Sequence, residues 1–246
     1  MKGQLSFVFF ILSASALAQQ PDSLHETRSR EESTTLLLYT RTIRDATGTI
    51  RFDLSAVPNF KVTKWLRVEL GLRHGERAGD MSAYDHYKVE FQTASLFYHT
   101  RLVARMSDNV VRYGSPNFSR TNYLLIAETR IPISKKFEAF ANAGYVISYL
   151  KNNIHEAIPE LSGLEDDHLI YKLSLRYKLS KGFVEGVLGT YDIFNPYSAS
   201  QPFLQTSFEY ELWEGGSLYS YLRYQFDQSV GTPFNNFLGL GIRFSL

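Results

Sequence analysis

The chain of 246 residues has no cysteine, no excess of charge of either sign and no long apolar run beyond its first residues. Without cysteine it forms no disulfide, thiolate metal site, thiol nucleophile or lipidated cysteine. The 26 basic residues nearly balance the 25 acidic ones. This balance argues against nucleic-acid binding, because a phosphate backbone attracts a basic surface. No later stretch approaches the roughly eighteen apolar residues of a transmembrane helix, so the pattern excludes a helical membrane protein.

The first eighteen residues have the three parts of a secretory signal peptide. Lys2 supplies the positive charge, Leu5–Leu12 is a short apolar core, and Ala16-Leu17-Ala18 is a cleavage site. An N-terminal membrane helix is the alternative, but the apolar stretch is too short and polar residues follow it at once. We therefore predict a cleaved signal peptide over 1–18. Residues 19–33 are polar and charged, and we predict a flexible periplasmic leader there.

Aromatic residues are abundant, with 18 Phe and 16 Tyr but only 2 Trp, and apolar residues recur with a period of two. In residues 66–73, for example, leucine and valine alternate with Arg67, Glu69, Gly71 and Arg73. Because a strand sends alternate side chains to opposite faces, each such segment has one apolar and one polar face. About twelve such segments are predicted, near residues 34–43, 49–60, 65–74, 84–95, 99–107, 119–131, 137–149, 168–179, 183–193, 203–212, 218–227 and 235–246.

The connectors between these segments alternate in length. The short ones are Lys61–Lys64, Leu96–Tyr98, Pro132–Lys136, Ser180–Gly182 and Trp213–Gly216. The intervening ones are mostly longer: Gly75–Ala83, Ser107–Phe118, Leu150–Asp167, Phe194–Pro202 and Gln228–Phe234, with the first hairpin, Asp45–Gly48, as the exception. Tight turns at one end and loops at the other are typical of bacterial outer-membrane barrels. The prediction for 34–246 is an all-β, single up-and-down antiparallel transmembrane β-barrel with both termini periplasmic.

The charge pattern predicts which face meets lipid. Each of the twelve segments is expected to have one row free of charge, and a membrane barrel turns that row outward. The opposite rows carry charges that a soluble barrel would have to bury at a cost of several kcal/mol each. We expect these residues to line the lumen: Arg51, Asp53, Arg67, Glu69, Arg73, Lys88, Glu90, Arg101, Arg105, Arg120, Glu128, Arg130, Glu138, Lys172, Arg176, Glu185, Glu209, Glu211, Arg223 and Arg243.

Aromatic residues gather near the segment ends, which predicts two girdles at the membrane interfaces; ordinary β-propensity is the alternative explanation. At the short-turn end they are Phe60, Trp65, Phe97, Tyr98, Phe137, Phe183 and Trp213. At the loop end they are Tyr84, Phe118, Tyr149, Tyr191, Phe194, Tyr197, Phe203 and Phe226.

The last ten residues, 237–246, alternate to the end of the chain, with Phe244 two residues before Leu246. Here the sequence resembles outer-membrane barrel proteins, whose closing strand ends in an alternating run with an aromatic at or near the C-terminus. The resemblance implies a location in the outer membrane of a Gram-negative bacterium, contact with its lipid and lipopolysaccharide, and recognition of 237–246 by the barrel-assembly machinery. The chain departs from the pattern by ending in leucine. Twelve-stranded members of this class include a phospholipase, small oligosaccharide and nucleoside porins, and barrels of no assigned function, which are closest in character.

Motifs for catalysis are largely missing. There is no G-x-S-x-G, no H-E-x-x-H and no glycine loop for phosphate. The phospholipase barrels place a histidine and a serine two residues apart, whereas His99 is followed by Arg101 and His168 by Ile170. Around the second loop, strand parity sends His74 outward and His86 inward, so we predict no metal site and no cofactor.

Three functions stay open at this stage. The polar inner rows predict a narrow pore for small polar solutes. The mixed signs of the lumen charges instead suggest ion-paired packing in a closed structural barrel. A lipid-modifying enzyme, of the phospholipase or lipid A hydrolase type, is the third possibility, and the pattern favours a protein that is not an enzyme. The pattern leaves the oligomeric state open.

Overall fold

The computed structural model describes residues 34–44, 50–77, 83–96, 98–112, 117–152, 165–197, 199, 201–226 and 234–246. The predicted signal peptide over 1–18 and the predicted leader over 19–33 lie outside the described residues. No described helix is long and apolar enough to cross a bilayer.

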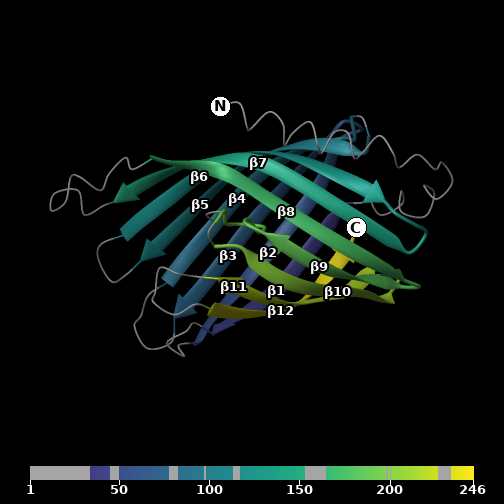
Figure 1. Ribbon diagram of the computed structural model, residues 1–246. Coiled ribbons are helices and arrows are strands. Elements are labelled where there is room, and N and C mark those ends of the chain that lie inside the picture. Colours follow the sequence, from purple (N-terminus) through teal and green to yellow (C-terminus); the bar gives the residue numbers. More distant parts are fainter. Residues whose placement is uncertain are drawn as a thin grey trace.

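The described chain forms twelve strands that close into one antiparallel barrel, as the alternation predicted (Figure 1). Their bounds are β1 Thr35–Arg44, β2 Ile50–Thr63, β3 Leu66–Arg77, β4 Ala83–Thr93, β5 Thr100–Arg112, β6 Asn117–Pro132, β7 Phe137–Asn152, β8 Glu165–Leu179, β9 Gly182–Gly189, β10 Phe203–Trp213, β11 Gly216–Phe226 and β12 Phe234–Ser245. Every strand pairs with its neighbours in sequence, and β1 pairs with β12. Because the sheet closes on itself, a strand with a neighbour on each side has no unpaired edge.

The seam between the first and last strands places both ends of the described chain at the short-turn end. Thr35 pairs with Ser245, and the N–H of Leu246 donates to the carbonyl of Thr34 over 2.8 Å. Two of the short turns reverse the chain through residues with a positive φ. Gly215 has a φ of 78°, and Tyr98 and His99 have φ values of 49° and 57°. Two consecutive residues in this region are typical of a type I′ hairpin turn, which normally takes Asn or Gly.

One strand is much shorter than the rest of the wall. β6 and β7 have 16 residues each, whereas β9 has 8 and ends at Gly189. Gly189 pairs with Lys172 on one side and Phe203 on the other. In the described pairings, the part of β8 that precedes Lys172 therefore pairs with β7 on one side and has no β9 residue opposite it on the other. The prediction of a strand over 183–193 was wrong for its last four residues, which leave the wall and pack inside the barrel.

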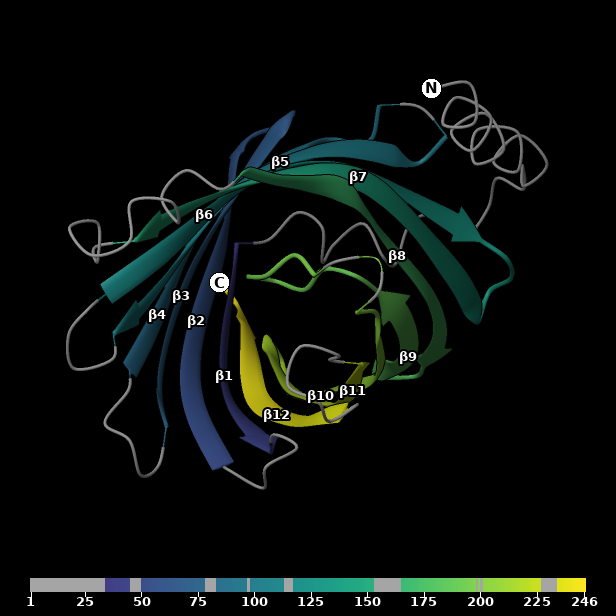
Figure 2. The ribbon, with the colours of Figure 1, turned by 60° about the vertical axis from the view of Figure 1, so that its left-hand side comes forward.

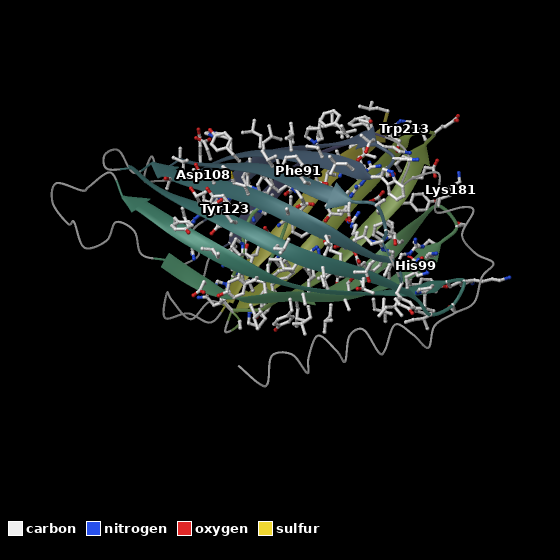
Figure 3. The ribbon with its side chains drawn as sticks, turned by 90° about the horizontal axis from the view of Figure 1, so that it is seen from above. Phe91, His99, Asp108, Tyr123, Lys181 and Trp213 are labelled. Carbon is white, nitrogen blue, oxygen red and sulfur yellow. The ribbon has the colours of Figure 1, made fainter. Side chains whose placement is uncertain are left out.

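The outer surface is apolar around its middle. Large aliphatic side chains on alternate positions are half exposed or more, including Leu54 and Leu125 at 61% each and Leu222 at 60%. Figure 3 shows Phe91 on the wall, Tyr123 toward the loop end, and Trp213 at the short-turn end with its ring, 48% exposed, outside the cylinder. Because water would not tolerate so large an apolar surface on a monomer, the belt suits hydrocarbon.

The expectation of a charge-free outer row in every segment was wrong near the loop end. Asp85 lies on the outward row of β4 and bonds to His74 of β3 over 2.7 Å. The strands also extend further than predicted, and the extension turns Asp108 and Asp167 outward. Thr121 donates to Asp108 over 3.1 Å, and the hydroxyl of Tyr145 donates to Asp167. The outward acids thus sit at the loop end with hydrogen-bond donors beside them, where the headgroup region rather than hydrocarbon is expected.

The lumen as candidate functional site

The charged residues that the sequence assigned to the lumen lie on the strand face opposite the exposed apolar row, and none of them is exposed. The most deeply buried are Arg73, Glu138, Lys88, Glu90, Glu209, Asp53, Arg223 and Arg105. Such burial inside a closed wall requires partners, because an isolated buried charge costs several kcal/mol. The partners fall into a belt at the short-turn end and a cluster at mid-height.

The belt near the short turns consists of charge pairs between strands, all adjacent except that Arg243 of β12 reaches Glu209 of β10 across β11. Arg101 donates to Glu128 over 2.7 Å, and Glu138 accepts from Lys178 over 2.7 Å and also from Arg130. The belt continues around the wall with Arg176–Glu185 at 3.4 Å and Arg243–Glu209 at 3.2 Å. Neighbouring strands therefore supply opposite charges across the register, and the belt as a whole has no single sign.

At mid-height one cation was missed by the sequence analysis. Arg41 of β1 is 4% exposed and holds the carboxylate of Asp53 on β2, its Nε lying 2.8 Å from Oδ2. The hydroxyl of Tyr84 donates to the same oxygen over 2.8 Å. Parity would have found Arg41, because it alternates with Leu38, Thr40 and Thr42 on the opposite face of the strand.

Residues 190–197, here called the inward segment, leave the wall where β9 ends and enter the lumen (Figure 2, green, between β9 and β10). Asp192 causes the turn: its Oδ1 accepts the backbone N–H groups of Phe194 and Asn195, each at 2.8 Å. The Asp192 N–H donates to the Asn195 carbonyl over 2.8 Å, and Pro196, which has no N–H, ends the turn. An aspartate that caps its own loop in this way offers the backbone an alternative to the strand ladder.

Asp192 also anchors the inward segment to opposite walls. Its Oδ2 accepts from Nη1 of Arg223 on β11 over 2.6 Å and from the hydroxyl of Tyr197 over 3.0 Å. Arg105 on β5 donates to the backbone carbonyl of Asp192 over 2.6 Å. Burial alone would raise the pKa of Asp192, but the guanidinium groups of Arg223, Arg73 and Arg41 hold that pKa well below its usual value. The segment therefore carries a negative charge at neutral pH into a cationic part of the lumen.

Two aromatic rings of the inward segment fill the lumen beside this anchor. Phe194 is 0% exposed, and the guanidinium carbon of Arg73 lies 4.1 Å from the centre of its ring. Tyr191 is 1% exposed and its hydroxyl accepts from the amide of Asn142 on β7 over 3.0 Å. Each ring belongs to a buried apolar cluster. The cluster around Tyr191 contains Val103, Leu124, Ile126, Val146 and Ile170.

These apolar clusters correct two expectations. The inner face was predicted to be polar throughout, but part of it is dry and aliphatic. The loop-end girdle was predicted to include four aromatics that the structure buries inside: Tyr84, Tyr191, Phe194 and Phe203, none more than 9% exposed. Phe183 also faces inward, 4.1 Å below the guanidinium of Arg176. The short-turn girdle is confirmed for Phe60, Trp65, Tyr98, Phe137 and Trp213, all at least 40% exposed. Phe97 and the side chains of Phe118 and Phe226 lie outside the described residues.

The described residues contain no group of three or more histidine, aspartate or glutamate side chains arranged to hold a metal ion. His74 is exposed on the outer wall and His86 is 8% exposed inside it, so the predicted divergence of these two histidines is confirmed. His74 bonds to Asp85 and His86 packs against Tyr84 and Phe194. Neither histidine is placed beside a serine hydroxyl as a general base would be.

Comparison with known proteins gives the fold but no family. No protein-family model matches the chain, and no curated protein matches it in sequence. Among solved structures, the KdgM porin in complex with disordered oligogalacturonate has a TM-score of 0.54 at 8% identity, over 86% of this chain and 99% of that one. The COG4313 outer membrane channel from Pseudomonas putida F1 has a TM-score of 0.54 at 11% identity, over 87% and 96%. The translocator domain of the autotransporter NalP from Neisseria meningitidis has a TM-score of 0.50 at 9% identity, over 100% and 98%. The chain therefore has the fold of bacterial outer-membrane barrels, and that fold serves channels and a translocator alike.

Proposed function

We propose that the protein resides in the outer membrane as a narrow pore for small polar solutes, and that the inward segment closes this pore in the described conformation. The observation that carries the proposal is that the residues obstructing the lumen do not belong to the strands of the wall. Ion pairs such as Arg41–Asp53 and Arg105–Glu90 join strands of the wall to each other, whereas the obstruction comes from a separate loop. A loop held by side-chain contacts can leave without breaking a strand ladder, so the closed state has a route to an open one.

The seal combines hydrogen bonds with buried ring contacts. Arg223 and Arg105 hold Asp192, and Asn109 on β5 donates to the side-chain oxygen of Asn195 over 2.8 Å. Tyr191 and Phe194 then supply the apolar filling. Sub-global opening of this one segment costs less than unfolding of the strands around it.

The test is single-channel recording in planar bilayers with and without a tether on the segment. Because the chain has no cysteine, an N109C/N195C pair can be linked by a short bifunctional thiol reagent that a reductant cleaves. We expect brief openings in the wild type, none in the linked protein, and their return after reduction. The single variant N195C with the same reagent is the control. Openings that persist after linkage would show that the segment is not the gate.

A closed structural barrel is the second candidate, and the filled mid-lumen favours it. Arg41, Asp53, Glu90 and Arg105 are all paired within the wall, and the two apolar clusters occupy space that water would need. This candidate predicts no conductance in any salt, from the wild type or from a D192N variant. Conductance in either protein would rule it out.

A further inference from the structure

The charges of the mid-lumen wall do not balance without the inward segment. Asp53 is held by Arg41, and Glu90 accepts from Nε of Arg105 over 2.5 Å. These pairs lie between strands β1, β2, β4 and β5 and would persist if the segment withdrew. Each wall carboxylate at this height thus has a cation of its own.

Arg73 and Arg223 are the arginines that contact Phe194 and Asp192 of the inward segment. Arg223 has its ion pair with Asp192, which belongs to the inward segment. Arg73 is 1% exposed, and its closest ion-pair contact is 3.8 Å from its Nε to Asp53, which Arg41 already holds. Withdrawal of the segment would therefore remove the carboxylate of Asp192. The guanidinium groups of Arg73 and Arg223 would then border the vacated space without it.

Two buried polar atoms around that space have no hydrogen-bond partner among the described residues. They are Nη1 of Arg73 and Nδ1 of His86, which is 8% exposed. Both side chains touch Phe194: Arg73 covers its ring, and the His86 ring meets it edge-on with centroids 6.0 Å apart. Buried polar atoms are rarely left unsatisfied, so two of them beside one removable ring indicate a position where a polar ligand would be held.

We propose that the pocket formed by Arg73, Arg223 and His86, which holds Asp192 and Phe194 in the closed state, is a binding site for small solutes that bear a carboxylate. The carboxylate of Asp192 is the internal occupant of this site. An incoming carboxylate accepts from Nη1 of Arg223 in its place and from the unpartnered Nη1 of Arg73, and His86 donates in the tautomer that carries a proton on Nδ1. The proposal rests on the pore function for the route of entry and names the class of solute.

Competition follows from the shared partners. Binding of the solute and docking of Asp192 use the same Nη1 of Arg223, so each weakens the other by the same factor. A carboxylate-bearing solute therefore opens the segment that would otherwise exclude it, whereas an uncharged solute of equal size does not.

The experiment measures binding to the purified full-length protein in detergent by isothermal calorimetry, with glucuronate and glucose as a pair that differ in the carboxylate. We expect D192N to bind glucuronate at least tenfold more tightly than the wild type does, and neither protein to bind glucose. E185Q is the matched control: it removes one lumen carboxylate, which pairs with Arg176 away from the pocket, and should bind glucuronate as the wild type does. Equal affinity in all three proteins, or no binding by D192N, would overturn the proposal.

A second measurement covers a D192N protein that fails to fold. In the wild type, glucuronate should raise the amide hydrogen exchange of residues 190–197 with increasing dose, and glucose should leave it unchanged. An unchanged exchange rate with both sugars would contradict the competition. Bilayer recordings separate the two proposals: binding without conductance rejects the pore and keeps the site, whereas conductance without glucuronate binding rejects the site and keeps the pore.

Discussion

The carboxylate of Asp192 accepts a hydrogen bond of 2.6 Å from Nη1 of Arg223, across 31 positions in sequence. This contact joins a loop that follows the shortest strand to the wall two strands further on. It converts what would be a surface loop into part of the barrel interior.

Gly71 on β3 leaves room for Phe194. A Cβ at Gly71 would lie 2.9 Å from Cε1 of Phe194 and 3.1 Å from Cβ of Lys88. We expect G71A to push the ring out of its site, because overpacking a filled interior costs about 1–3 kcal/mol. The measurement is amide exchange of residues 190–197, which should rise. G186A is the matched control, since nothing lies within 4 Å of a Cβ there; exchange that rises equally in both variants would refute the account.

Acid should release the inward segment only at a pH below the ordinary range of aspartate. The pKa of Asp192 is lowered in the folded protein, so its ion pairs contribute stability above the unfolded value of about 3.9, and the contribution is lost as the pH falls through the lower folded value. Arg223, Arg73 and Arg41 stay charged throughout, and burial raises the pKa of the Tyr197 hydroxyl to about 12. We expect the open probability in bilayers to stay constant from pH 7 to 4 and to rise only below that. A rise that begins near pH 5 would contradict this assignment.

The lipid-facing wall should tolerate charge according to depth. Leu173 on β8 and Leu212 near Trp213 are exposed to similar extents, 49% and 53%. L173R places a charge in the middle of the apolar belt and should destabilise the barrel by about 2–4 kcal/mol, whereas L212R at the short-turn end should cost about 0–1 kcal/mol. Urea unfolding in lipid vesicles measures both. Equal costs would mean that the belt does not face hydrocarbon.

The β4–β5 turn contains removable strain. His99 has a φ of 57°, a conformation that costs a residue with a Cβ about 1–2 kcal/mol and glycine nothing. H99G should therefore raise the free energy of unfolding by about 1 kcal/mol in the same urea assay. S180G, in the β8–β9 turn, has no positive φ to relieve and should be neutral or destabilising. A loss of stability in H99G would show that the imidazole makes a contact worth more than the strain.

Local pattern was sufficient for the wall and insufficient for the interior. The period of two predicted the number of strands and their order, because a strand's geometry depends on neighbours in sequence. Arg41 follows from the same rule. The inward course of residues 190–197 does not, because Tyr191 and Phe194 suit an interfacial girdle as well as a buried cluster. The deciding contacts, Asp192 with Arg223 and Phe194 with Arg73, join residues far apart in sequence.

The early end of β9 also has a consequence for the order of events in assembly. The residues that receive the inward segment lie on β3, β5, β7 and β11: Arg73, Arg105, Asn142 and Arg223. No single hairpin holds enough of them to capture the segment. We therefore expect the barrel to close before the inward segment docks. A newly assembled barrel then passes through a stage in which its lumen is not yet obstructed.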